Sequence, residues 1–294
     1  MRVIVPPLHR ATTAWAAWAD WASKLLCVIL FCGFSMSTVH GQCNNARHRL
    51  QAGEQVTYDL YFKWGLLMPR AGVASLSVQS DTYQQQAAWR YRLLFRTTGM
   101  FEKIFSMRDT MDCYYARPHG TLLFSTKHSD EQDYYSVDDL YFRYIGDSVQ
   151  VRSHRYTLNR TKIDTVMTAQ ACLFDMLGAT MQLRTLDWNQ FSQGAEFPFH
   201  IAIGRDLVPA AFRYAGQQVI DRGDVKYRTR HFYIDVYDEA FTQSKAAGEV
   251  WIGDDENHIP VKIRAKLKIG AAEVYYKESQ NLRHPLSCRV AIPK

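Results

Sequence analysis

The 294-residue chain lacks the short motifs that mark common enzyme chemistry. It contains no GxSxG, HExxH, GxxxxGK[ST] or GxGxxG pattern, so a hydrolase elbow, a zinc-protease helix and two kinds of phosphate-binding loop are unsupported. A nucleophile, a base and an orienting group could still assemble from distant positions. The absences therefore lower the expectation of an enzyme without removing it. No catalytic residue and no cofactor is predicted.

Charge of one sign is also scarce. The net charge is +6 over the whole chain, too small to indicate a nucleic-acid-binding protein. The six cysteines include no CxxC pair, which leaves a zinc site or a redox pair unsupported, and no metal site is predicted. What the chain does have is 47% hydrophobic residues and many aromatics, with 17 Tyr and 15 Phe. This composition is typical of a globular, strand-rich protein.

The N-terminus has the features of a secretion signal. Lys24 precedes an apolar run over residues 25–39, and small residues at Val39 and Gly41 favour cleavage before Gln42. The run has 15 residues, whereas a membrane-spanning helix needs about 20. We therefore expect residues 1–41 to be a signal peptide with an unusual N-terminal extension. We also expect the protein to be exported to the periplasm or outer cell envelope, with no transmembrane span in the mature chain.

Alternatives at this end are an uncleaved anchor and a lipidated Cys43. After cleavage the chain keeps four cysteines, an even number in an oxidising compartment. One pairing would join Cys43 to Cys288 and Cys113 to Cys172. Buried free thiols are the competing interpretation.

Alternation of apolar and polar residues with a period of two dominates the mature chain. It is clear over residues 55–62, 89–97 and 230–238, and it is complete over 261–270. Such segments predict antiparallel strands with one face on a core and one in water. About a dozen of them are separated by turn signals. We see no linker, so residues 42–294 are expected to form a single mostly-β domain.

Two segments depart from the alternation. Residues 98–109 could hold one short helical turn, and residues 169–188 have a helical pattern in which Leu173, Leu177 and Met181 share a face. Gly178 weakens this helix. The predicted fold is a large curved antiparallel sheet or open barrel with one principal helix over about residues 170–185.

The acidic stretch GDDENHIP, residues 253–260, raises the possibility of a metal site. Counted from Asp254, an EF-hand loop would need Gly at Ile259 and Glu at Ala265, so the calcium pattern fails. Asp and Asn favour turns, and the stretch is interpreted as a hairpin turn over residues 254–257. The similar HSDEQD stretch, residues 128–133, is interpreted as a solvated hairpin tip.

Charged residues within apolar surroundings provide the remaining site candidates. A stripe of Lys262, Arg264, Lys266 and Lys268 could meet lipid phosphates or an acidic partner, although a solvated strand face is the simpler interpretation. Arg108 with Asp109, and Asp175 with Arg184 and Asp187, lie beside apolar segments. They could form buried ion pairs that fix the helix to the sheet, or line a cleft. The ligand-binding candidates are Lys63, Trp64, Arg108, Asp109, Leu177 and Arg184.

Four stretches carry a family resemblance: GEQVTYDLYFKWG, TTGMFEKIFSMRDT, FDMLGATMQLRTLDW and VWIGDDENHIPVKIRAKLKIG, in that order. Together they resemble the exported bacterial family known as domain of unknown function 3108, over roughly residues 50–280. The resemblance implies a fold class and a location but no reaction. The last stretch is also similar to one hairpin of the periplasmic lipoprotein-carrier fold, which implies a curved open sheet able to hold acyl chains.

We therefore predict a non-enzymatic envelope module that binds or carries a hydrophobic or amphipathic ligand. The alternative is a structural or assembly factor that binds an envelope protein through an exposed sheet face, and an envelope hydrolase is third. A closed-bottom apolar interior would favour the first, a flat apolar patch the second, and three convergent polar side chains in a cleft the third.

Overall fold

A computed structural model describes residues 50–117, 120–170, 172–237, 246–267 and 269–291. The chain divides into two units, Met1–His40 and Gly41–Lys294, and the fold below is that of the second. The predicted signal peptide, Cys43 and Lys268 lie outside the described residues.

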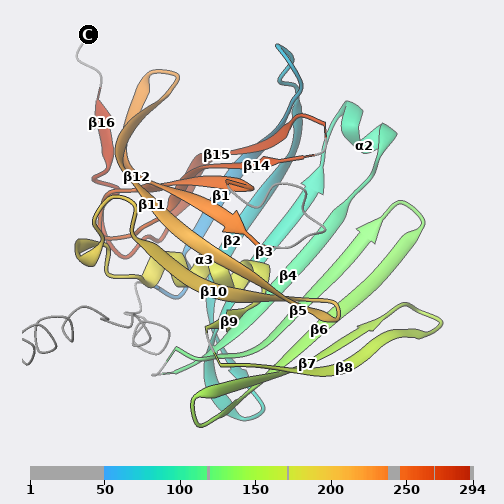
Figure 1. The fold of residues 1–294 in the computed structure, drawn as a ribbon. Coiled ribbons are helices and arrows are strands. Elements are labelled where there is room, and N and C mark those ends of the chain that lie inside the picture. The colour runs from blue at the N-terminus through green and yellow to red at the C-terminus, as the bar shows by residue number, and fades with distance from the viewer. Residues whose placement is uncertain (1–49, 118–119, 171, 238–245, 268, 292–294) are drawn as a thin grey trace, which may run out of the picture. The chain divides into compact units, whose positions relative to one another are not determined.

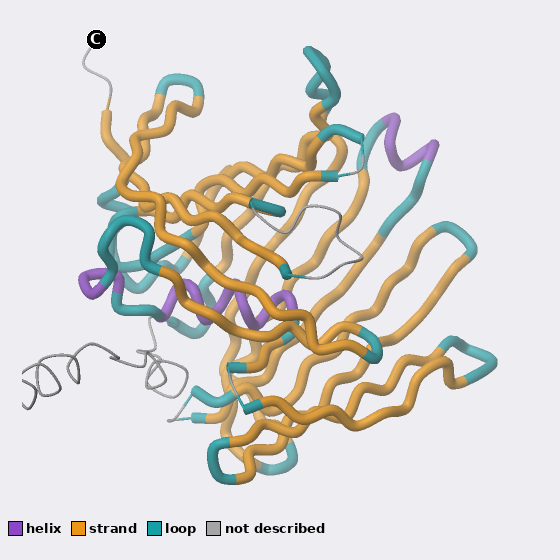
Figure 2. Tube along the Cα trace, in the orientation of Figure 1, coloured by secondary structure: helices purple, strands orange, loops and turns teal. Residues whose placement is uncertain are grey.

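The described residues form a mostly-β fold with two α-helices, α2 and α3 (Figures 1 and 2). The first half contains β1 (Gln55–Lys63), β2 (Arg70–Tyr83), β3 (Gln86–Thr97), α2 (Met100–Ile104), β4 (Arg108–Ala116), β5 (Leu122–Glu131), β6 (Tyr134–Ile145), β7 (Ser148–Tyr156) and β8 (Thr161–Ala169). The second half contains β9 (Leu173–Phe174), α3 (Met176–Thr185), the 3₁₀ helix η2 (Trp188–Gln190), β10 (Glu196–Ile203), β11 (Asp206–Arg222), β12 (Val225–Val236), β13 (Gly248–Gly253), β14 (Pro260–Lys266), β15 (Ala271–Gln280) and β16 (Arg289–Ala291).

All of these strands belong to one sheet. Its order is β8-β7-β6-β5-β4-β3-β2-β1-β15-β14-β13-β12-β11-β10-β9, with β16 beside β12. Neighbours are antiparallel except β9 and β10, which are parallel. The sheet curls so far that the β10–β11 turn reaches the opposite edge, where Arg205 Nη2 donates to the Lys162 carbonyl oxygen at 3.4 Å. The result is a nearly closed, barrel-like sheet.

Antiparallel pairing places the connections at two opposite ends. We call one end the rim: it carries the β1–β2, β5–β6, β7–β8, β10–β11 and β14–β15 turns and the β3–β4 connection that contains α2. We call the other end the base: it carries the β2–β3, β4–β5, β6–β7, β11–β12 and β13–β14 connections. In Figure 1, α2 and the β5–β6 and β7–β8 turns lie on the side of the sheet away from α3.

Helix α3 lies across the strands inside the base. Its first turn contacts Tyr115 and Leu122 from β4 and β5, and its last turn contacts Glu54 just before β1 and Asn257 in the β13–β14 turn. Buried side chains on the inner strand faces, such as Val78 and Phe232, complete one apolar core with it. The predicted curved sheet with one principal helix is thus confirmed.

The boundaries differ from the prediction in two respects. The helix begins at Met176 rather than near 170, because Leu173 and Phe174 pair with β10 and Asp175 caps the helix. The described sheet has 16 strands rather than about a dozen. The short helical turn expected within residues 98–109 is present as α2. No helix in the described residues is long and apolar enough to cross a membrane.

Candidate functional site

The start of α3 is fixed by a buried polar cluster. The Asp175 side chain accepts hydrogen bonds from the Gly178 amide at 2.7 Å and from the Cys113 thiol at 3.2 Å, while the Tyr115 hydroxyl donates to the Gly178 carbonyl at 3.1 Å. Burial raises the pKa of Asp175 and of the Cys113 thiol. A Cβ at position 178 would lie 2.5 Å from Asp175 Oδ1, so glycine is required there by close approach.

The end of α3 is held by a buried ion pair. Arg184 Nη1 lies 2.7 Å from Glu54 Oε1, and the two side chains are 1% and 2% exposed. Arg184 Nη2 also donates to the Asn257 carbonyl at 3.1 Å. The buried Tyr58 and Tyr91 are electrostatically coupled to the pair, and burial raises the pKa of Tyr91 to about 12 despite the opposing charge of Arg184. Charges so deeply buried need an oppositely charged partner, and Glu54 and Arg184 are each other's partner.

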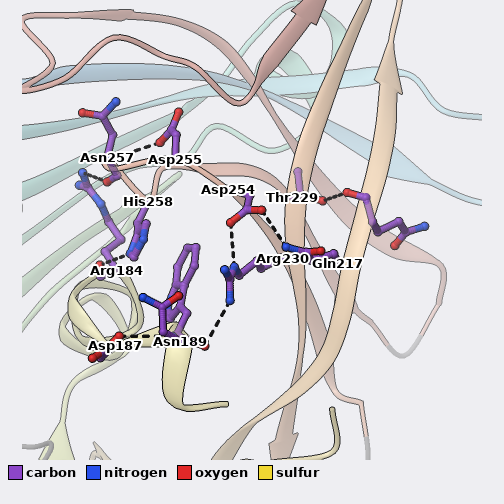
Figure 3. Close-up of polar contacts among 12 residues, drawn as sticks. Arg184, Asp187, Asn189, Gln217, Thr229, Arg230, Asp254, Asp255, Asn257 and His258 are labelled. Carbon is purple, nitrogen blue, oxygen red and sulfur yellow. Dashed lines mark hydrogen bonds and ion pairs between the residues drawn. The ribbon is translucent and has the colours of Figure 1, made fainter. Parts of the chain in front are cut away.

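The acidic GDDENHIP stretch forms the β13–β14 hairpin turn, as predicted, and its side chains bind other parts of the chain (Figure 3). Asp254 forms an ion pair with Arg230 at 2.8 Å and accepts from Gln217 Nε2 at 3.0 Å. The Asp255 carboxylate accepts hydrogen bonds from the backbone N–H of Asn257 at 2.9 Å and of Cys288 at 3.2 Å. Among the described residues, no group of three or more His, Cys, Asp or Glu side chains could hold a metal ion.

The same turn also supports the region after α3. The His258 ring stacks on Trp188 with centroids 3.4 Å apart, and its Nδ1 lies 2.8 Å from the Arg184 carbonyl oxygen. The Asn257 side chain bonds to backbone groups of His284 and Pro285. The turn therefore ties α3 and the C-terminal segment to the base of the sheet, which is a structural role.

On several strands, apolar side chains of the inner face are less buried toward the rim than at the base. Near the base, Val56 and Tyr58 on β1 and Tyr91 on β3 are almost completely buried. Two or four residues nearer the rim on the same strands, Leu60 and Leu93 are only partly buried. The apolar inner residues Met111, Ile201, Ile263 and Val274 of β4, β10, β14 and β15 are also only partly buried. The base is packed, whereas these apolar side chains nearer the rim remain partly accessible. The polar inward residues Asp109, Ser129 and Ser136 are buried at the rim end.

Charged side chains interrupt this apolar inner face on one wall. Cross-strand register places Met111, Lys127, Asp138 and Arg155 in one row over β4 to β7. Lys127 Nζ lies 3.2 Å from Asp109 Oδ2, and Arg155 is ion-paired with Asp138. The Lys127 and Arg155 side chains are 37% and 34% exposed, so both cations remain accessible although they point inward.

Two predicted ligand-binding residues lie in the base. Leu177 is 4% exposed and belongs to the core. Arg184 forms the expected helix-to-sheet ion pair, but its partner is Glu54 rather than Asp175 or Asp187, which instead cap α3 and η2.

The other four lie at the rim without forming one cluster. Lys63 faces outward and forms an ion pair with Glu273 at 3.8 Å, and Trp64 is 59% exposed in the β1–β2 turn. Arg108 pairs with Glu102 of α2. Asp109 alone faces inward, where it pairs with Lys127. Two cations of the basic stripe are also paired, since Lys262 and Arg264 form ion pairs with Glu273.

Reasoning from the sequence missed Glu54, Lys127, Asp138 and Arg155. Lys127 follows Ser125 at a spacing of two and so belongs to the same face, but its charge made that face look solvent-exposed. Glu54 precedes the first strand and has no local sign of burial. The burial of Glu54 is explained by its partner Arg184, which lies 130 positions later in the chain.

The two cysteine pairings that we considered are wrong. Cys113 and Cys288 are free, buried thiols, whereas Cys172 is disulfide-bonded. Cys113 faces Asp175 beneath the start of α3, and Cys288 packs against Gly253, where an added Cβ would lie 2.8 Å from its sulfur. The alternative of buried thiols holds for these two residues.

Comparisons with known proteins address the fold and the family. The model of a family described as "Protein of unknown function (DUF3108)" matches residues 57–277. The search of curated proteins found no match. A solved structure described as a "Beta-barrel-like Protein of Domain of Unknown Function DUF1849" from Brucella abortus is similar, with a TM-score of 0.56 and 7% identity. The similarity covers 79% of this chain and 99% of that one, and at such low identity it concerns the fold alone.

Proposed function

The chain belongs to the DUF3108 family, in agreement with the resemblance of its motifs, and we propose that it is an exported, non-enzymatic module that binds a hydrophobic or amphipathic ligand on the rim half of its inner face. The observation that carries this proposal is the base-to-rim change in burial. Inner side chains are packed around α3 at the base, and apolar counterparts nearer the rim, such as Leu60, Leu93 and Val274, are only partly covered. A ligand would enter from the rim and stop at the packed base.

The chemistry of this inner surface fits an amphiphile. Leu60, Leu93, Ile263 and Val274 provide apolar contacts, and burial of an acyl chain contributes about 0.8 kcal/mol per CH₂ before the cost of association. Lys127 and other inward charges provide polar contacts for a head group. The ligand is therefore expected to lie with its chain toward the apolar wall.

Export is part of the proposal and has its own support. The N-terminal apolar run resembles a signal peptide, and the disulfide at Cys172 favours an oxidising compartment such as the periplasm. Intact-mass measurement of the protein from the cell envelope tests this. Loss of residues 1–41 is expected, a retained run over residues 25–41 would contradict cleavage, and an added lipid on Cys43 would favour the lipoprotein alternative.

A calorimetric titration of the protein with long-chain fatty acids and lysolipids tests ligand binding. Leu93→Gln places an amide on the inner face and should weaken binding about ten-fold, because burying an unpaired polar group costs on the order of 1–3 kcal/mol. Leu94→Gln is the matched control, since Leu94 is the next residue on β3 and faces outward with 45% exposure. Saturable binding that both variants reduce equally, or no binding at all, would contradict the proposal.

A further inference from the structure

Apolar side chains protrude from the turns at the rim. In the β1–β2 turn, Leu66 is 104% exposed, Leu67 62% and Trp64 59%. In the β3–β4 connection, Met100 and Ile104 of α2 are 63% and 65% exposed. Large apolar residues at the tips of turns contribute nothing to the core, so their exposure calls for another explanation.

The topology gathers these tips at one end of the sheet (Figures 1 and 2). Phe62 at the end of β1 contacts Phe101 of α2, with ring centroids 6.3 Å apart, so the first two tips are neighbours. Three more rim turns also carry an exposed apolar residue: Tyr134 (50%), Leu158 (83%) and Ile269 (66%). Five successive rim connections around the sheet, from β14–β15 to β7–β8, therefore present apolar tips.

Cations accompany the apolar tips. Lys103 lies next to Ile104 in α2, Arg160 follows Leu158, and Lys266 precedes the β14–β15 turn, and all three are exposed. On α2 the carboxylate of Glu102 is neutralised by Arg108 at 2.6 Å. The β5–β6 turn, which contains Asp133, is the acidic exception. Most tips thus combine an apolar side chain with a positive charge.

We propose that the rim docks on a lipid surface that contains anionic lipids, with the apolar tips inserted at the level of the head groups. Separate protruding tips suit a deformable bilayer better than the flat, continuous surface of a folded protein partner. Trp favours the membrane interface, apolar groups gain by shallow insertion, and Lys and Arg are attracted by anionic head groups. Docking by the rim is distinct from ligand binding on the inner face and involves different residues.

Co-sedimentation of the protein, purified in the form that the cell produces, with lipid vesicles tests the proposal. The vesicles are phosphatidylcholine alone or phosphatidylcholine with about one third phosphatidylglycerol. We expect at least about ten-fold stronger binding to the anionic vesicles, and weaker binding at high salt. Leu66→Ser combined with Ile104→Ser should reduce binding about ten-fold or more. Met176→Ser combined with Val219→Ser is the control, since those residues are 61% and 56% exposed but lie outside the rim.

Because every variant has the same N-terminal segment, any contribution of that segment to vesicle binding cancels in the comparison. The rim variant should bind soluble lysolipid as tightly as the unchanged protein, which separates docking from ligand binding. Equal vesicle binding by the rim and control variants would overturn the proposal. A rim variant that changes only the oligomeric state in sedimentation velocity would also overturn it and would assign the rim to self-association.

Discussion

The buried pair of Glu54 and Arg184 offers the sharpest test of how α3 is held. Arg184→Met removes the cation and leaves a carboxylate that is 2% exposed, with Oε2 already without a hydrogen-bond partner among the described residues. Breaking a buried ion pair from one side costs about 3–5 kcal/mol. The Asn257 carbonyl also loses a donor, which adds about 1 kcal/mol. We expect a loss of about 4–6 kcal/mol, a large share of a typical total stability of 5–15 kcal/mol.

Replacing both charges at once should cost much less. The double variant Glu54→Leu with Arg184→Met leaves no unpaired buried charge, and such replacements are often neutral. The coupling energy from the double-mutant cycle should therefore exceed about 2 kcal/mol. Urea unfolding, monitored by tryptophan fluorescence and circular dichroism with the disulfide intact, measures all four stabilities. If Arg184→Met alone costs less than about 1 kcal/mol, or if the two single losses simply add, the assignment of a dry, mutually dependent pair is wrong.

Three further results are expected. The free energy of unfolding should fall as pH rises from about 10 toward about 12. The unfolded chain releases the Tyr91 proton near the ordinary pKa of 10.0, whereas burial raises the folded-state pKa to about 12. The fall should reach about 2–3 kcal/mol in urea titrations, and Tyr91→Phe should reduce it. Cys113 and Cys288 should resist alkylation until the protein unfolds, as judged by mass spectrometry, since burial raises both thiol pKa values. Leu177→Gln should lower the unfolding free energy by about 3 kcal/mol and weaken ligand binding as well, and an unchanged urea midpoint would show that the site is not packed.

The fold could be predicted from the sequence largely because one physical signal repeats. Residues 230–238 alternate, and β12 indeed places Phe232 and Ile234 inward with His231 and Tyr233 outward. The signal weakens where an inner face is polar, as on β7, where Ser153 and Arg155 face inward. Strand counting from alternation therefore falls short of the observed number. The helix start was misplaced because Leu173 lies four residues before Leu177 and so fits the helical pattern, although it pairs with β10.

The site was harder to predict, because its contacts join distant parts of the chain. Charges near Arg184 in the sequence suggested Asp175 and Asp187 as partners, but curling of the sheet brings Glu54 to the helix instead. The acidic turn was predicted correctly because Asx geometry and calcium spacing are local properties. Its long-range role in binding the C-terminal segment through Asn257 has no local signature.

The dimensions of α3 explain why apolar inner side chains are less covered away from the base. A helix with its side chains is about 10 Å across, whereas a twelve-residue strand such as β3 spans about 40 Å. A single helix lying across the strands therefore covers roughly a quarter to a third of their length. Where it lies, aromatic and aliphatic side chains close around it. Farther along the same strands, Leu60, Leu93 and Val274 keep their inward direction without a helix to cover them. A second helix over the rim half would have completed an ordinary core. Its absence from the described residues leaves an apolar surface that an amphiphile entering from the rim could cover.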